Sequence, residues 1–291
     1  MLLRVTSVIA LFKYVNCFYV PGVAPVEFKR GDPVEVKAVK MTSSMTQLPY
    51  EYYSLKFCKP INGTFYKTEN LGEVLRGDRI VNTPFEVNMA EPKECRILCN
   101  KVSSPLSWNE QESKELSDRI FHEYYVHLLV DNLPCATKFD LQDTGERVYE
   151  RGYKLGFIQD NNAYVNNHLN IILSYHTDNN EDFRVVRFEV EALSVDVSEI
   201  KGNDNDNSCS FPEKHKPQKV NPKEPTNILF TYSVEWRPSE VRWASRWDIY
   251  LQMTDVQIHW FSIVNSLVVV FFLSGILTMI MIRTLRRDIA R

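Results

Sequence analysis

Cysteine is the residue type whose number and spacing most directly suggest chemistry in this sequence. There are six cysteines, and Cys17 falls in a predicted signal peptide, so five remain in the mature chain. Five cannot all pair in disulfides, and we expect Cys135 to stay unpaired. The two expected bridges form among four candidates: Cys58, Cys95, Cys99 and Cys209. The sequence leaves their partners open; a closure involving the distant Cys58 and Cys209 would stabilise the fold by a few kcal/mol.

A metal site is the alternative role for Cys95 and Cys99, which are spaced as CxxxC. No second CxxC motif or nearby histidine pair completes a zinc ligand set, so structural disulfides are favoured. His168 and His176 lie on the polar face of one predicted strand, eight residues apart. At about 3.3 Å per residue they are roughly 26 Å from one another and cannot share an ion. We interpret both as surface histidines and expect no metal or cofactor.

Catalytic signatures are missing from the sequence. It has no HExxH, GxSxG, Walker or GxGxxG motif, and no cysteine and histidine at catalytic spacing. Its carboxylates are numerous but form no distinctive pair. We therefore expect a protein that is not an enzyme and that has no evident small-molecule substrate.

Two short motifs indicate surface roles. Asn62 begins an Asn-Gly-Thr sequon, which is a candidate for glycosylation if the segment is luminal. Arg76, Gly77 and Asp78 spell the tripeptide of integrin ligands. There the glycine can simply supply a turn while the arginine and aspartate pair, so adhesion through this motif is an alternative rather than the leading hypothesis.

Charge excludes nucleic acid as a partner. The formal net charge is −3, and the nine C-terminal residues contribute +3, which leaves −6 for residues 1–282. Phosphate binding needs clustered positive charge, and the basic residues are dispersed. A hydrophobic content of 44%, with 16 Phe and 14 Tyr, is enough for a folded core.

Most periodic segments alternate with a period of two, which is typical of β-strands. The segment at 183–192 changes phase at Val185 and Val186, as a β-bulge would require. We predict a mainly β fold, an antiparallel β-sandwich-like luminal domain with a short helix, followed by a C-terminal transmembrane α-helix. The expected strands are residues 34–40, 124–130, 153–158, 168–176, 183–192 and 227–236.

One helix interrupts this pattern. Ser107 and Glu110 fit a capping box, which predicts a helix from about Trp108 to Glu123. Residues 202–227 are rich in Asn, Asp, Lys and Pro, and we interpret them as a mobile loop.

The run from Trp260 to Ile282 has 23 residues and no charge. At about 1.5 Å per residue it spans roughly 34 Å, which is enough to cross a bilayer. Positive charge follows it, which predicts a cytoplasmic C-terminus and a luminal N-terminus. The residues that define this orientation are Arg283, Arg286, Arg287 and Arg291.

The expected organisation follows from these segments. A charged start and a short apolar run indicate a signal peptide, which implies an oxidising compartment for the rest. The predicted divisions are a signal peptide at 1–17, a luminal β-rich domain at 18–240 with its loop at 202–227, a juxtamembrane segment at 241–259, a transmembrane helix at 260–282 and an Arg-rich cytoplasmic tail at 283–291.

Aromatic residues at helical spacing precede the span and predict an interfacial element; a helix packed in the core is the alternative. The membrane-interface candidates are Trp243, Trp247, Tyr250 and Trp260. Within the span, Ser262, Asn265 and Ser266 fall within an arc of about 100°. An asparagine in hydrocarbon needs a hydrogen-bonding partner, so we expect other transmembrane helices to pack here.

Longer motifs carry a family resemblance. The segments FYVPGVAP, LPYEYYSLKFC, LGEVLRGDRIVNTPF, YYVHLLVDNLP and WASRWDIYL, followed by IHWFSIVNSLVVVFFLSGI, resemble the transmembrane 9 superfamily, the nonaspanin or EMP70 family. The resemblance runs through essentially the whole mature chain. It implies a Golgi and early endosomal membrane protein with a β-rich luminal domain and nine helices. Because this sequence ends at Arg291, after the first helix, we expect either a fragment or a short product.

Three functions remain. The resemblance implies sorting and localisation of other membrane proteins, with downstream roles in adhesion and phagocytosis. Its partners would be the lipid bilayer and the transmembrane helices of cargo or of the remaining bundle. A small-molecule or ion transporter within a nine-helix bundle is the first alternative, although the visible span has no charged residue to mark an ion path. An adhesion receptor that uses Arg76 to Asp78 is the second.

Overall fold

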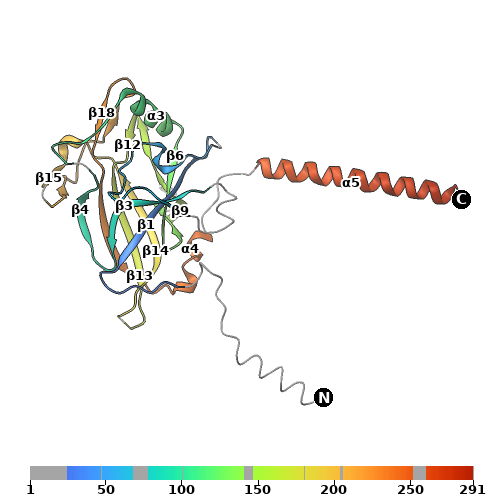
Figure 1. The fold of residues 1–291 in the computed structure, drawn as a ribbon, viewed down its shortest axis with the longest axis horizontal. Coiled ribbons are helices and arrows are strands. Elements are labelled where there is room, and N and C mark those ends of the chain that lie inside the picture. Colours follow the sequence, from blue (N-terminus) through green and yellow to red (C-terminus); the bar gives the residue numbers. More distant parts are fainter. Residues whose placement is uncertain are drawn as a thin grey trace, which may run out of the picture. The chain divides into compact units, whose positions relative to one another are not determined.

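The structure is a computed structural model, and it describes residues 25–46, 48–67, 78–99, 101–140, 147–179, 181–203, 206–251 and 260–290. The chain separates into two compact units that divide after residue 253. The first is a mainly β domain and the second contains a long helix (Figure 1). The predicted signal peptide at 1–17 lies outside the described residues.

The first sheet of the β domain is antiparallel. Its strands follow the order β10-β6-β1-β3-β2, with β7 also paired to β6. The pattern of β6 explains its place, because alternate residues from Tyr124 to Val130 are buried and those between are half-exposed. The bounds are β1 Pro33–Ser43, β2 Tyr66–Lys67, β3 Ile80–Asn88, β6 Tyr124–Val130, β7 Leu133–Pro134 and β10 Tyr153–Lys154.

The second sheet has eight strands in the order β15-β16-β4-β19-β13-β14-β8-β9. It is mixed, because β13 pairs in parallel with β19 and β14 pairs in parallel with β8. The expected antiparallel arrangement therefore holds for the other pairs but is wrong for these two. The bounds are β4 Lys93–Ile97, β8 Ala136–Asp140, β9 Arg147–Arg151, β13 His168–His176, β14 Arg184–Leu193, β15 Lys201–Asn203, β16 Ser208–Ser210 and β19 Thr231–Pro238.

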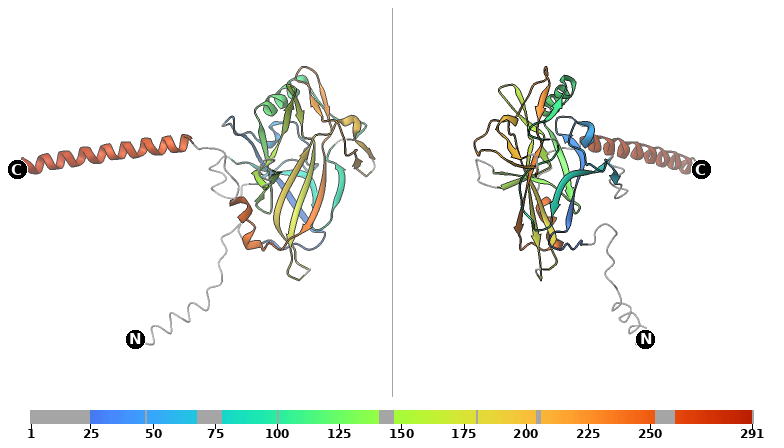
Figure 2. Two further views of the ribbon diagram at one scale, coloured as in Figure 1. Left: turned by 180° about the vertical axis from the view of Figure 1, so that it is seen from behind. Right: turned by 60° about the vertical axis from the view of Figure 1, so that its left-hand side comes forward.

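The two sheets face one another as layers (Figure 2). One cluster of buried side chains joins them, with Val36 and Leu128 from the first sheet and Ile171 and Phe188 from the second. Burial of this apolar surface is the main driving force for the domain, at about 25 cal/mol for each Å² removed from water. The core is thus that of a β-sandwich, as predicted.

The expected loop at 202–227 contains several short strands in its described part. It contains β15, β16 and two further short strands, β17 at Lys219–Val220 and β18 at Thr226–Ile228. β17 joins β11 (Gly156–Gln159) and β12 (Asn162–Val165) in a three-stranded sheet, and β18 pairs with β5 (Leu106–Trp108). Mobility of this segment stays a prediction, although isolated apolar residues such as Val220, which is 1% exposed, attach part of it to the domain.

The short helix, α3, extends from Glu110 to Phe121. Its N-cap is Asn109, whose side chain accepts a hydrogen bond from the backbone N–H of Glu112 while the Glu112 carboxylate accepts one from the backbone N–H of Asn109. The predicted capping box at Ser107 and Glu110 is therefore displaced by two residues, because Ser107 belongs to β5.

The C-terminal unit is the helix α5, from Trp260 to Ile289. It is longer than the predicted span at 260–282, since the arginines that follow the apolar run continue the same helix. The helix is long and apolar enough to cross a membrane from Ile263 to Ile289, and 18 consecutive residues within it have a mean hydropathy of 2.4.

Candidate functional site

Two disulfides lie close together, one at the middle of β4 and one just after that strand. Cys58 pairs with Cys99, with a Cα–Cα distance of 5.6 Å, and Cys95 pairs with Cys209, with a Cα–Cα distance of 4.9 Å. The structure thus joins the four expected candidates, and no bridge closes directly between Cys58 and Cys209. Cys135 is a free, buried cysteine, and burial raises the pKa of its thiol to about 12, which leaves it unreactive.

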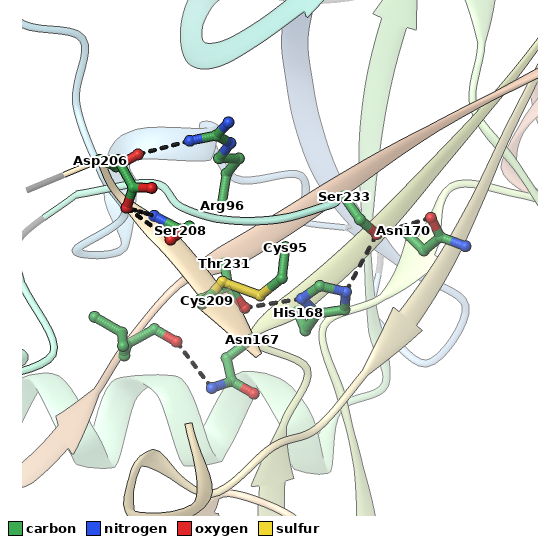
Figure 3. Close-up of a disulfide and its surroundings, with 11 residues drawn as sticks. Cys95, Arg96, Asn167, His168, Asn170, Asp206, Ser208, Cys209, Thr231 and Ser233 are labelled. Carbon is green, nitrogen blue, oxygen red and sulfur yellow. Dashed lines mark hydrogen bonds between the residues drawn. A yellow bond between two sulfur atoms is a disulfide. The ribbon is translucent and has the colours of Figure 1, made fainter. Parts of the chain in front are cut away.

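The Cys95–Cys209 disulfide links β16 to β4, its neighbour in the second sheet (Figure 3). Beside it, Arg96 donates a hydrogen bond from Nη1 to the backbone oxygen of Asp206, at 2.6 Å. The Asp206 carboxylate accepts bonds from the backbone and the hydroxyl of Ser208. These contacts hold the β15–β16 turn against β4.

His168 is not the surface residue predicted from its strand position. It is 3% exposed, and its Nδ1 lies 2.8 Å from the Thr231 hydroxyl. The Phe211 ring, from a segment distant in the sequence, packs against His168, and alternation along β13 carries no information about that contact. His176 is half-buried instead, with its Nδ1 3.0 Å from the carbonyl oxygen of Ser239.

Metal binding has no support in the described part of the chain. There, no group of three or more His, Cys, Asp or Glu residues is placed so that it could hold a metal ion.

The two short motifs have different surroundings. Asn62 lies in an exposed turn, followed by Gly63 with a φ of +84°, which favours glycine. Of the integrin-type tripeptide, Arg76 and Gly77 lie outside the described residues. Asp78 forms an ion pair with Lys40 and its side chain is only 12% exposed. An aspartate in that position is poorly available to a receptor.

The segment before the span packs on the β domain. It contains a 3-10 turn at Trp243–Ser245 and the short helix α4 at Asp248–Leu251. Tyr250 is 3% exposed, which favours the alternative of a segment packed in the core over a membrane-interface role for this residue. Trp243 is half-buried, and Trp247 is 41% exposed and remains available to an interface. The side chain of Trp260 lies outside the described part.

The polar face of α5 is only partly described. Asn265 and Ser266 are exposed, whereas the side chain of Ser262 lies outside the described part. Thr278 and Thr284 donate their hydroxyl hydrogens to carbonyl oxygens four residues earlier in the helix, each at 2.8 Å. Among the described side chains of α5, Asn265 has no comparable bond, so its amide is free to pair with another molecule.

The basic residues after the apolar run lie on the same helix. Arg283, Arg286 and Arg287 are exposed, and Arg291 lies outside the described residues. The apolar side chains of α5 from Ile263 onward are largely exposed within this unit.

A disulfide-linked β domain followed by an apolar helix of spanning length defines a membrane protein. The chain belongs to the Endomembrane protein 70 family, which it matches over residues 49–291.

Its relatives are longer. The chain is 54% identical to Transmembrane 9 superfamily member 4 of Mus musculus, over 94% of this chain and 45% of that protein. It is 44% identical to Transmembrane 9 superfamily member 8 of Arabidopsis thaliana, over 95% of this chain and 44% of that one. A Dictyostelium discoideum protein named Putative phagocytic receptor 1a is 38% identical over 94% of this chain and 44% of its own length. The chain thus spans less than half the length of these curated relatives. No solved structure matches it.

Proposed function

We propose that this protein sorts other membrane proteins by binding their transmembrane helices through the polar face of α5. It acts in Golgi and early endosomal membranes, and roles in adhesion and phagocytosis follow from the proteins it delivers. The family supports this proposal, and so does the name of the Dictyostelium discoideum relative, a putative phagocytic receptor.

The observation that carries the proposal is the unpaired amide of Asn265 in an apolar helix. Lipid tails offer helices no hydrophobic reason to associate, so close packing and hydrogen bonds must hold them together. Asn265 and Ser266 supply a hydrogen-bonding group and a small neighbour on one side of α5. A partner helix with a donor or acceptor at the same depth would satisfy the amide, with about 0.6 to 2 kcal/mol of stabilisation.

In the proposed orientation the β domain lies in the lumen. Disulfides form in oxidising compartments, which supports a luminal position for both bridges. The arginines at the other end of the apolar run support a cytoplasmic C-terminus.

Replacement of Asn265 by Leu tests the proposal. The variant keeps the apolar length needed for insertion and removes the amide. We expect lower co-purification of membrane proteins and their mislocalisation, measured by quantitative surface labelling in cells that express only the variant.

Thr278→Val is the matched control, because the Thr278 hydroxyl is already bonded within its own helix. It should leave both readouts unchanged. Loss of detergent stability in Asn265→Leu without loss of co-purified proteins would show that the face packs internally, and equal behaviour of the two variants would refute the proposed recognition.

A further inference from the structure

Residues 210–215 form a cover that is fixed at both ends and lightly held between them. At one end Cys209 is bonded to Cys95. At the other, the backbone N–H of Gln218 donates to the Ser194 hydroxyl at 2.9 Å, and the Lys216 carbonyl accepts from the N–H of Asp196 at 2.8 Å. Between these anchors the chain has no assigned helix or strand beyond Ser210.

One aromatic side chain of this cover, Phe211, packs on a buried residue of β13. The Phe211 ring lies edge-to-face with the His168 imidazole, with 4.8 Å between centroids, and the same phenylalanine packs on His215 at 5.4 Å. Pro212, Glu213 and Lys214 are exposed. Opening the cover therefore requires mainly the displacement of Phe211.

The hydrogen bonds of His168 favour a neutral imidazole. The Ser233 hydroxyl donates to the Asn170 side-chain oxygen at 2.8 Å, so it can accept from His168 Nε2, which lies 3.4 Å away. His168 Nδ1 then accepts from the Thr231 hydroxyl at 2.8 Å. This assignment of the tautomer follows from the network (Figure 3). A second proton on Nδ1 would require the Thr231 hydroxyl to turn from donor to acceptor.

The described residues around His168 also provide no counter-charge. Its partners on β19, Thr231 and Ser233, are uncharged hydroxyls. On the cover, the group whose charge acts on His168 is His215, which would add a second positive charge. The Glu191 carboxylate on β14 does not contact His168 directly; it accepts a hydrogen bond from the side-chain amide of Asn170, at 3.4 Å. A buried imidazolium without a carboxylate partner is costly.

We propose that residues 210–215 are an acid-released cover, in which protonation of His168 displaces Phe211 and opens the segment between its two anchors. This goes beyond the sorting role and is a property of the β domain itself. His215 and Pro217 also line an open groove of about 440 Å³ beside Leu193 and Ser194. Opening the cover therefore changes one wall of that groove.

The pKa of His168 shifts in the direction that this geometry requires. Burial, with a further contribution from His215, lowers the pKa of His168 to about 4. An exposed histidine has a pKa of about 6.5, so the open form binds the proton more tightly, and acid favours opening. Between pH 7.5 and 5.0 the equilibrium constant for opening should rise about 30-fold.

Hydroxyl-radical footprinting of the whole chain in detergent tests this directly, because it reports the solvent access of Phe211. We expect oxidation of Phe211 to rise from pH 7.5 to 5.0, relative to the core residue Phe188, which is 0% exposed. His168→Gln should abolish the rise, whereas His176→Gln, on the same strand, should keep it.

Two results would overturn the proposal: oxidation of Phe211 that does not change with pH, or a full pH response in His168→Gln. Where His168→Gln does not accumulate as folded protein, His215→Gln provides the second test. It removes the opposing charge, so the acid-induced rise should become smaller, and an undiminished rise would also overturn the proposal.

Discussion

Arg246 and Asp131 form a buried ion pair, with 2.5 Å between Nη1 and Oδ2 and side chains that are 3% and 6% exposed. The arginine comes from the segment that precedes the spanning helix, and the aspartate lies in the turn between β6 and β7. Arg246 also donates to the carbonyl oxygen of Val185 at 3.3 Å and lies over the Trp243 ring at 4.5 Å. This pair holds residues 242–250 on the β domain.

Arg246→Met should lower the free energy of unfolding of the β domain by about 3 to 5 kcal/mol, since it leaves the Asp131 carboxylate buried without a partner. Burial raises the pKa of that carboxyl even though Arg246 lowers it, so desolvation outweighs the attraction. The double variant Asp131→Leu, Arg246→Met should therefore recover most of the loss. Denaturant unfolding followed by tryptophan fluorescence measures both changes.

Arg237→Gln is the exposed counterpart. Arg237 bonds Glu235 at 2.7 Å, and both side chains are nearly half exposed, so its loss should cost less than about 1 kcal/mol. Equal losses for Arg246→Met and Arg237→Gln would contradict the importance of the buried pair.

The disulfides should differ in their contribution to stability. The bridge between Cys58 and Cys99 spans 41 residues and that between Cys95 and Cys209 spans 114. Chain entropy then predicts losses of about 4 and about 5 kcal/mol for Cys99→Ser and Cys209→Ser. Cys135→Ser should cost far less, because its hydroxyl can still bond the Val126 carbonyl and accept from the N–H of Leu128. Thermal unfolding of the three variants measures these losses of stability. A large loss in Cys135→Ser alone would contradict this ranking.

A second histidine should make the β domain sensitive to acid. The Nε2 atom of His127 lies 2.7 Å from the Thr42 hydroxyl oxygen, within hydrogen-bonding distance. Burial lowers the pKa of His127 to about 4; the charges of Lys40 and Arg151 lower it further, and that of Asp78 raises it. The unfolded chain therefore binds the proton more tightly. The neutral, buried His127 contributes fully to the stability of the β domain above about pH 6.5, and this contribution falls by up to about 2 kcal/mol at pH 5.

His127→Gln should reduce the pH dependence of the unfolding free energy between pH 7.5 and 5.0 by that amount. His122→Gln, at the exposed end of α3, should leave it unchanged. Parallel curves for the wild type and His127→Gln would assign the acid sensitivity to other groups.

Glycosylation of Asn62 would report the location of the β domain. We expect one glycosidase-sensitive band shift that disappears in Asn62→Gln and Thr64→Val and persists in Thr64→Ser, because serine preserves the sequon. A tag placed after Arg291 should at the same time be digested by protease added to sealed microsomes. Protection of that tag would reverse the proposed orientation.

Local alternation was enough to locate the strands that face one core. The predicted limits of β6 and β13 match those observed. The predicted bulge in β14 is also confirmed, because Ser174 pairs with Arg187 and Tyr175 with Val185, which leaves Val186 without a partner. In these segments the alternation with a period of two arises because one face of the strand is buried, and it can be read from the residues of the strand itself.

Features that depend on distant segments were not predictable in this way. Residues 153–158 form parts of two strands in different sheets rather than one, because β10 pairs with β6 and β11 pairs with β12. The burial of His168 depends on Phe211, and that of Tyr250 on how the segment before the span folds back on the domain. No spacing within either segment carries that information.

The distance of 114 residues between Cys95 and Cys209 also bears on the order in which the domain matures. At about 5 to 20 residues per second, the ribosome makes Cys209 roughly 6 to 23 s after Cys95. β4 must also wait for its neighbour β19, and such non-local pairing is slow to form. During this interval Cys58, Cys95 and Cys99 are all available to one another, and mispaired bonds are corrected only by thiol–disulfide exchange. We therefore expect newly made chains to pass through non-native disulfide isomers, and their secretory transport to depend on a disulfide isomerase.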